Sequence, residues 1–134
     1  GYPVMGVKVT LIDGSYHTVD SSDIAFEQAA AIAVKAALEK AGPVLLEPVM
    51  KVEVVVPEVN FGVVQSSLLA KRGFITDCRI HGKIRTIDAK VPLSEMFGYS
   101  SEIRSATAGR GTFTMEPCSY ERVPEQIAEQ VISL

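Results

Sequence analysis

The sequence is poor in several residues that would point to particular classes of protein. It contains no tryptophan, two histidines and two cysteines, so a disulfide framework is not expected. The two cysteines, Cys78 and Cys118, are more typical of a reduced, cytoplasmic protein. No apolar run approaches the length of a membrane span, and no signal peptide opens the sequence. We therefore expect no contact with a membrane.

An excess of basic charge is also missing. The formal net charge is −3, which gives no overall signal for nucleic acid. The charge is uneven, because residues 1–47 carry three lysines against six acids, whereas residues 48–134 carry ten charges of each sign. Between residues 71 and 90, two acids accompany a basic set made up of Lys71, Arg72, Arg79, Lys83, Arg85 and Lys90. This set predicts either an ordinary solvated face or a surface that contacts RNA phosphates.

The apolar content of 47% is enough for one domain of average size or two small ones. Residues 1–47 predict a strand at 4–12, a turn at 13–15 and an alanine-rich helix over 23–41, which Gly42 and Pro43 end. Such a piece cannot cover its own apolar faces. We therefore expect partner strands upstream in a larger protein, or docking or self-association of the piece.

Residues 48–134 predict a complete domain after a boundary at Glu47–Pro48. Alternating apolar residues indicate strands at 50–56, 74–80 and 87–91, and Cys78 is expected to be a small core residue. Helical spacing at 61–68 indicates a helix that ends near Gly73. With the elements that follow, the order is β-α-β-β-α-β. The predicted fold class is α+β, a partial βαβ unit followed by a ferredoxin-like (split βαβ) domain.

The stretch 91–116 supplies the second helix and the last strand of this order. One helical face is formed by Leu93, Met96, Phe97, Ser100 and Ile103. Gly109 and Gly111 then end the helix on either side of Arg110, and alternation over 112–116 predicts a half-buried strand. A final helix is expected to start near Pro124 and to bury Ile127, Val131 and Ile132.

Residues that could carry chemistry are few. There is no GxxxxGK[ST] phosphate loop, and no Ser/His/acid set can be assembled, so we expect no catalytic residue, metal or cofactor in this chain. His17 lies near Asp20 and Asp23. The ordinary interpretation is a loop histidine beside helix-capping carboxylates, and a metal or catalytic site is the less common one. A third hypothesis is recognition of unpaired RNA bases by His17, Tyr16 and Ser15.

Five segments resemble one family. The chain is similar to the C-terminal part of bacterial elongation factor G, with matches spread over nearly its whole length. They are DGSYHTVDSSDIAF at 13–26, VLLEPVMKVEVVVPE at 44–58, KRG at 71–73, VPLSEMFGYSSEIRS at 91–105 and GRGTFTME at 109–116. The resemblance implies that residues 1–47 are the end of domain IV and residues 48–134 are domain V.

The resemblance also implies a function. Such factors promote GTP-dependent translocation of tRNA and mRNA on the ribosome, and they bind GTP and Mg²⁺ in an upstream domain. The loop at 13–23, with Ser15, Tyr16, His17 and Asp20, would reach the decoding region of the small subunit. Candidate contacts with large-subunit RNA and the stalk base are Lys71, Arg72, Arg104 and Arg110. The piece itself would contact the ribosome and do no chemistry.

Two alternatives remain open at this point. The segment 62–73, GVVQSSLLAKRG, departs from the family pattern, which commonly has acidic and glycine residues early and a longer basic run. A paralogue that acts in ribosome recycling or ribosome protection would account for this departure. An alternative from another class is a ferredoxin-like regulatory module that binds a small ligand at a sheet interface.

Overall fold

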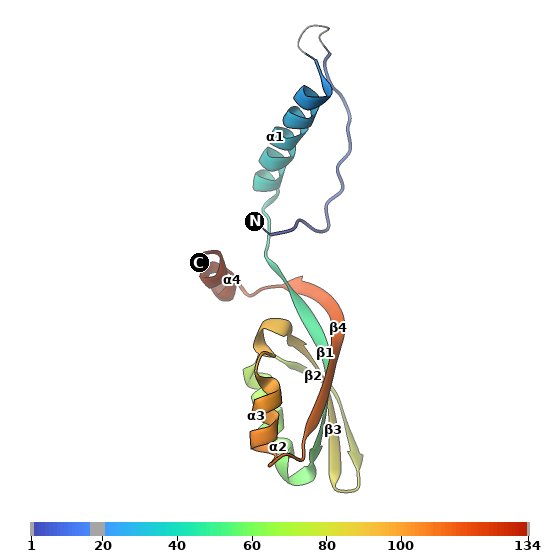
Figure 1. Cartoon of the computed structure of the whole chain (residues 1–134), viewed down its shortest axis with the longest axis vertical. Coiled ribbons are helices and arrows are strands. Elements are labelled where there is room, and N and C mark those ends of the chain that lie inside the picture. The colour runs from blue at the N-terminus through green and yellow to red at the C-terminus, as the bar shows by residue number, and fades with distance from the viewer. Residues whose placement is uncertain (1, 17–20, 134) are drawn as a thin grey trace. The chain divides into compact units, whose positions relative to one another are not determined.

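The computed structural model describes residues 2–16 and 21–133, and the chain forms two compact units that divide after Pro43 (Figure 1). Strand β1 of the second unit begins at Leu46, slightly ahead of the boundary expected after Glu47.

In the first unit, the helix was predicted correctly and the strand was not. Helix α1 (Asp23–Ala41) is capped by Ser22, whose Oγ accepts a hydrogen bond from the Ala25 N–H at 3.1 Å, and Gly42 ends it with φ 71°. Residues 4–12 form no strand. A strand exists only when its backbone groups pair with another strand, and no described residue provides that pairing. Every side chain of α1 is exposed or half-buried.

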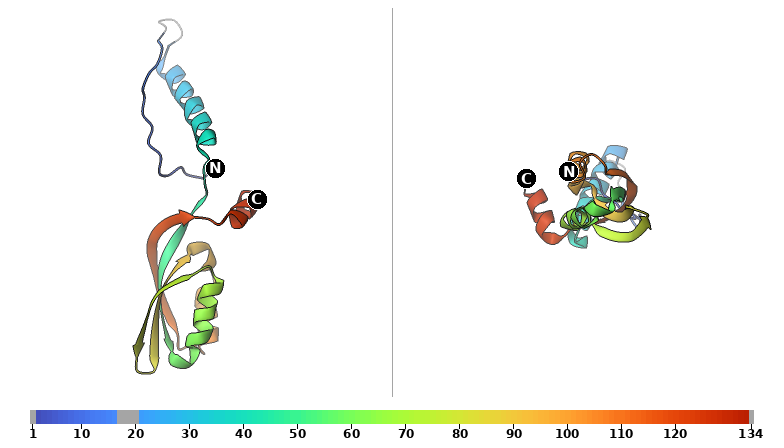
Figure 2. Two further views of the ribbon diagram at one scale, coloured as in Figure 1. Left: turned by 180° about the vertical axis from the view of Figure 1, so that it is seen from behind. Right: turned by 90° about the horizontal axis from the view of Figure 1, so that it is seen from below.

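The second unit is a four-stranded antiparallel sheet with two helices on one face (Figure 1 and Figure 2). The strands, in the order β2-β3-β1-β4, are β2 (Phe74–His81), β3 (Ile84–Pro92), β1 (Leu46–Pro57) and β4 (Thr112–Arg122). The helices that cover the sheet are α2 (Phe61–Ala70), after the short 3₁₀ helix η1 (Glu58–Asn60), and α3 (Tyr99–Ala106), after η2 (Leu93–Glu95). This arrangement confirms the predicted α+β fold and the β-α-β-β-α-β order.

Alternate side chains of the two central strands form the core beneath the helices. Val52, Val54 and Val56 of β1 are at most 1% exposed, and the same holds for Ile87, Ala89 and Val91 of β3. Their helix partners are Val64 and Leu68 of α2 together with Tyr99 and Ile103 of α3. The Tyr99 ring also meets Phe113 of β4 edge-on, with ring centroids 4.9 Å apart.

The stretch 91–116 is divided differently from the single helix that was predicted. Gly98, with φ 79°, separates η2 from α3, and this break rotates the face that the helix presents to the sheet. Phe97 is therefore 78% exposed, and Tyr99 occupies the buried position that helical spacing assigned to Ser100.

Two further burial predictions were wrong. Cys78 is exposed, because β2 is an edge strand that extends beyond the cover of the helices. Helix α4 (Glu125–Ile132) begins after Pro124 as expected, but it has no buried residue within its described range. It follows the end of β4 and stands away from the sheet (Figure 1), so Ile132 remains 67% exposed.

Gly73 closes the turn between α2 and β2, and we expect Gly73→Ala to be destabilising. A Cβ there would lie 2.5 Å from the Leu68 carbonyl oxygen and 3.1 Å from Val91 Cγ2. Relief of this overlap should lower the free energy of unfolding by about 2 kcal/mol. Urea denaturation followed by far-UV circular dichroism measures the change.

Gly62→Ala is the matched control. Gly62 lies in α2, and an added methyl group there would have no neighbouring atom within 4 Å, so alanine should raise the free energy of unfolding by about 0.5 kcal/mol. Equal stability of the two variants would contradict the close packing described for Gly73.

Candidate functional site

The predicted tip residues are only partly within the described structure. His17 and Asp20 lie outside the described residues. Tyr16 is exposed and stacks on Phe26 of α1, with ring centroids 6.4 Å apart and an interplanar angle of 12°. Ser15 is exposed beside it. The described part of the loop therefore places one aromatic ring against the first turns of α1.

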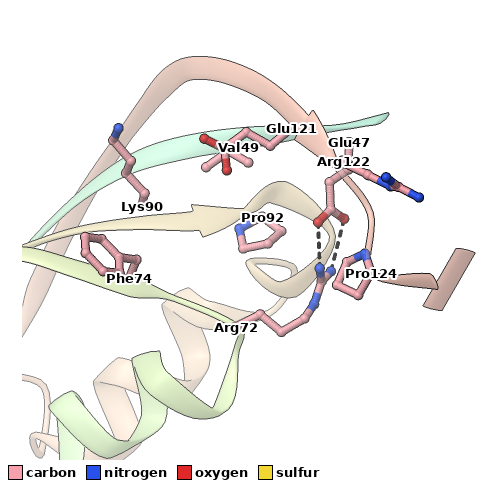
Figure 3. Close-up of a pocket in the computed structure, with 9 residues that line it drawn as sticks. All are labelled: Glu47, Val49, Arg72, Phe74, Lys90, Pro92, Glu121, Arg122 and Pro124. Carbon is pink, nitrogen blue, oxygen red and sulfur yellow. Dashed lines mark hydrogen bonds and ion pairs between the residues drawn. The ribbon is translucent and has the colours of Figure 1, made fainter. Parts of the chain in front are cut away.

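Arg72 forms ion pairs with two acids of the second unit. Its guanidinium donates to both carboxylate oxygens of Glu47, at 2.6 and 3.0 Å (Figure 3). Its Nε donates to Glu95 at 3.2 Å. A further contact reaches Ser94 Oγ at 3.3 Å. The hydrogen bonds that Arg72 donates to Glu47 raise the pKa of Arg72. The residue adopts φ 58°, so these contacts hold a backbone conformation that arginine seldom adopts.

Lys71 is also paired within the domain. Its Nζ lies 2.8 Å from Glu102 Oε2 and 5.8 Å from the centroid of the Tyr99 ring. Ser67 Oγ donates to the other oxygen of Glu102 at 2.5 Å. The hydrogen bond from Lys71, with that from Ser67, lowers the pKa of Glu102. Burial, assisted by the nearby Glu102 charge, raises the pKa of Tyr99 to about 12.

Arg104 and Arg110 are more open to a partner. Both side chains are exposed, and neither forms an ion pair with a described residue. Arg110 follows Gly109, which has a positive φ of 80°. Glycine is required at position 111 because of close packing and not because of its backbone conformation. A Cβ at Gly111 would lie 2.8 Å from the Thr107 side chain. The Thr107 hydroxyl also accepts a hydrogen bond from the Gly111 N–H at 2.7 Å.

The structure does not bring these four basic residues together. Arg72 contacts Glu47 at the start of β1, whereas Arg110 precedes Thr112, which pairs with Val55 near the end of β1. The span from residue 47 to residue 55 is about 26 Å at the usual strand rise. Arg72 and Arg110 therefore lie at opposite ends of the sheet.

The basic set between residues 71 and 90 is largely neutralised by acids from elsewhere in the chain. Besides Lys71 and Arg72, Arg79 pairs with Glu53 and Asp88 at 3.2 and 3.1 Å, and Arg85 pairs with Glu58 at 3.1 Å. Most of these acids lie on β1, η1, η2 or α3, far away in sequence. These acids lie outside the segment in which the charges were counted. The strand register is needed to identify them as partners of the basic residues.

Two other kinds of feature are absent from the described residues. No three His, Cys, Asp or Glu side chains in residues 2–16 and 21–133 are grouped so that they could hold a metal ion. No helix in the described part of the chain has the length and apolarity to cross a membrane.

Comparison with known proteins identifies the family. The family model for the elongation factor G C-terminus matches residues 44–131, and the model for elongation factor G domain IV matches residues 1–42. The chain belongs to the elongation factor G family. It is 52% identical over 132 residues to the elongation factor G of Fervidobacterium nodosum.

The family likeness extends to three dimensions. A crystal structure of a Thermus thermophilus protein matches 90% of the chain with a TM-score of 0.81 and 40% sequence identity. The chain spans 18% of that protein and 19% of the Fervidobacterium factor, so it corresponds to a small part of such relatives.

Arg72→Ala should destabilise the second unit. The substitution leaves Glu47 and Glu95, both partly buried, without the cation that they share. We expect the free energy of unfolding to fall by about 2 kcal/mol. Arg79→Ala is the control, because that side chain is 46% exposed and its ion pairs are screened by solvent, so its loss should cost clearly less than the loss of Arg72. Chemical denaturation of both variants tests the difference, and an equal cost would contradict a structural role for Arg72.

The Glu102 carboxylate should make stability depend on pH. Because its pKa is lowered in the folded state, the stability it contributes is present above its unfolded pKa and is lost as pH falls through the folded value. The difference in unfolding free energy between the parent chain and Glu102→Gln should therefore be constant at neutral pH and shrink as pH falls below the unfolded pKa of about 4.3. Denaturation at several pH values measures it, and a difference that is constant with pH would contradict the assignment.

Proposed function

We propose that this chain is the ribosome-contacting, C-terminal part of an elongation factor G-type translation factor that promotes GTP-dependent translocation of tRNA and mRNA in the cytoplasm. The observation that carries the proposal is the 52% identity to elongation factor G over 132 residues, which includes both units and the loop at 13–23. Domain IV corresponds to the first unit and domain V to the second.

The proposal assigns no chemistry to the chain itself. Its one Gly-Lys pair, Gly82–Lys83, lies in the turn between β2 and β3 and does not open a helix, so it does not fit a phosphate loop. GTP and Mg²⁺ would be bound by a GTPase domain elsewhere in the parent protein. In this proposal, the two units act by binding ribosomal RNA, tRNA and mRNA through their exposed residues.

The proposed contacts fall on the two units separately. Ser15, Tyr16, His17 and Asp20 would approach the decoding region of the small subunit, together with its tRNA and mRNA. On the second unit, Arg104 and Arg110 are exposed and are the stronger candidates for large-subunit RNA near the stalk base. Lys71 and Arg72 remain candidates, but an RNA phosphate would have to compete with the acids that already bind them.

One observation favours a second candidate within the family, a paralogue that acts in ribosome recycling or ribosome protection. Helix α2 exposes Val63 and Leu69 to 59% and 55%, within the segment that departs from the family pattern. A partner of different character at this helix would account for the change. Translocation and subunit-splitting assays on the intact parent distinguish the two functions.

His17→Ala in the full-length parent tests the proposed role of the loop. We expect single-round translocation to slow at least tenfold, with ribosome-stimulated GTP hydrolysis nearly unchanged, because the imidazole would act at the decoding region and not at the nucleotide. Rapid-mixing assays of mRNA movement and phosphate release measure the two rates. Parallel loss of both rates would count against the loop as the translocating tip.

A further inference from the structure

The second unit contains a pocket of ≈ 540 Å³ at one end of the sheet face that α2 and α3 leave open (Figure 3). This volume is within the range of small-ligand sites. The end of β4 and the residues before α4 curve over it. Its lining consists of Glu47, Val49, Arg72, Phe74, Lys90, Pro92, Glu121, Arg122 and Pro124.

An exposed aromatic ring stands at one side of this pocket. Phe74, the first residue of β2, is 70% exposed although it is a large apolar side chain on a strand. It pairs directly with Lys90 of β3, so both side chains lie on the same, open face of the sheet. The described aromatic residues provide no ring that stacks on it. One face of Phe74 is thus available to a planar ligand.

Lys90 carries a positive charge that no described acid neutralises. Four other basic residues of the 71–90 set are paired with acids, but Lys90 forms no ion pair with any described residue. It also pairs across the sheet with Lys51, whose only described ion pair, to Glu116, is long at 3.9 Å. An anion bound beside Phe74 would therefore meet Lys90, with Lys51 as its neighbour on the adjacent strand.

The opposite side of the pocket supplies a hydrogen-bond acceptor. The Arg72–Glu47 pair forms that wall and is mutually satisfied. Glu121, the strand partner of Glu47, also lines the pocket, and its carboxylate forms no ion pair with a described residue. Its weak described contact is the Ser119 hydroxyl at 3.4 Å. A carboxylate accepts hydrogen bonds and cannot donate them.

We propose that this pocket binds one unpaired nucleotide of RNA, with the base stacked on Phe74, the phosphate at Lys90 and an exocyclic amino group at Glu121. The inference rests on the proposed function, because it adds a site for ribosomal RNA on domain V. Base stacking on an aromatic of an open sheet, with a nearby cation for the backbone, is a general mode of single-strand recognition.

The chemistry of the pocket favours a nucleotide over an apolar peptide. A peptide side chain on Phe74 would remove Lys90 and Glu121 from water without giving them partners, which is costly. A nucleotide provides an anion for the lysine and a donor for the carboxylate. Cytosine offers an amino group where uracil offers a carbonyl oxygen, so the pocket should prefer cytosine to uracil.

Fluorescence anisotropy with labelled RNA octamers tests the proposal on the whole 134-residue chain. Phe74→Ala should weaken binding of oligo(C) about tenfold, and Phe74→Tyr should retain it because the ring remains. Lys90→Gln should reduce the slope of log affinity against log salt by about 0.7, the value for one phosphate of a single strand. Glu121→Gln should abolish the preference for oligo(C) over oligo(U), since an amide both donates and accepts.

Matched controls come from the same hairpin. Ile80→Ala removes another exposed apolar residue of β2, and Lys83→Gln removes a lysine from the turn, so both should leave affinity nearly unchanged. Circular dichroism establishes that each variant is folded. An octamer duplex should bind at least tenfold more weakly than the single strand.

The proposal is overturned if Phe74→Ala and Lys90→Gln bind as the parent chain does, if the controls lose as much affinity, or if duplex RNA binds equally well. Loss of affinity in Arg104→Gln and Arg110→Gln alone would place RNA elsewhere on the unit. That result would reject the pocket and leave the proposed function standing. Failure of translocation assays in the parent, in contrast, would reject the function independently of this site.

Discussion

The second unit depends on the burial of one face of β1 beneath two helices. β1 is the only described strand that pairs with both β3 and β4, so its register determines where each of the other two lies. Its alternating valines are almost completely buried under α2 and α3. Each such side chain contributes about 1.5–3 kcal/mol relative to an exposed position, so this one face supplies a large share of the driving force. Side chains of the opposite face of β1, such as Lys51 and Glu53, are exposed.

Sequence periodicity was sufficient to predict the fold, but it did not predict the exposure of individual side chains. Alternation and helical spacing predicted all four strands and both covering helices of the second unit, because a repeating pattern tolerates single exceptions. The burial of Phe97 was predicted incorrectly because it depends on the break at Gly98. The burial of Cys78 was predicted incorrectly because the helices do not extend over that part of β2. The strand expected at 4–12 failed because its formation depends on a partner strand, which a single segment cannot reveal.

The candidate site was harder to predict than the fold, because the residues that pair with its basic side chains are distant in sequence. Basic residues are easily found in the sequence, but the acids that neutralise Arg72 and Lys71 lie 25 and 31 positions away along the chain. Tertiary structure thus converts an apparent RNA-binding set into a network that holds α2, η2 and β1 together. Lys90, Arg104 and Arg110, in contrast, form no ion pair with any residue that the structure describes. The sequence pattern alone did not distinguish these three from the paired basic residues.

The position of β1 in the sheet affects how the domain folds during synthesis. β1 is the first strand of the unit to leave the ribosome during synthesis, yet Val52 pairs with Met115, 63 positions later. Loop-closure entropy must therefore be overcome across almost the whole domain before the sheet is complete, which favours slow folding. Until β4 emerges, one edge of the valine-rich strand remains unpaired and open to association with other nascent chains. The last strand of the sheet to be synthesised is therefore the one that covers this edge.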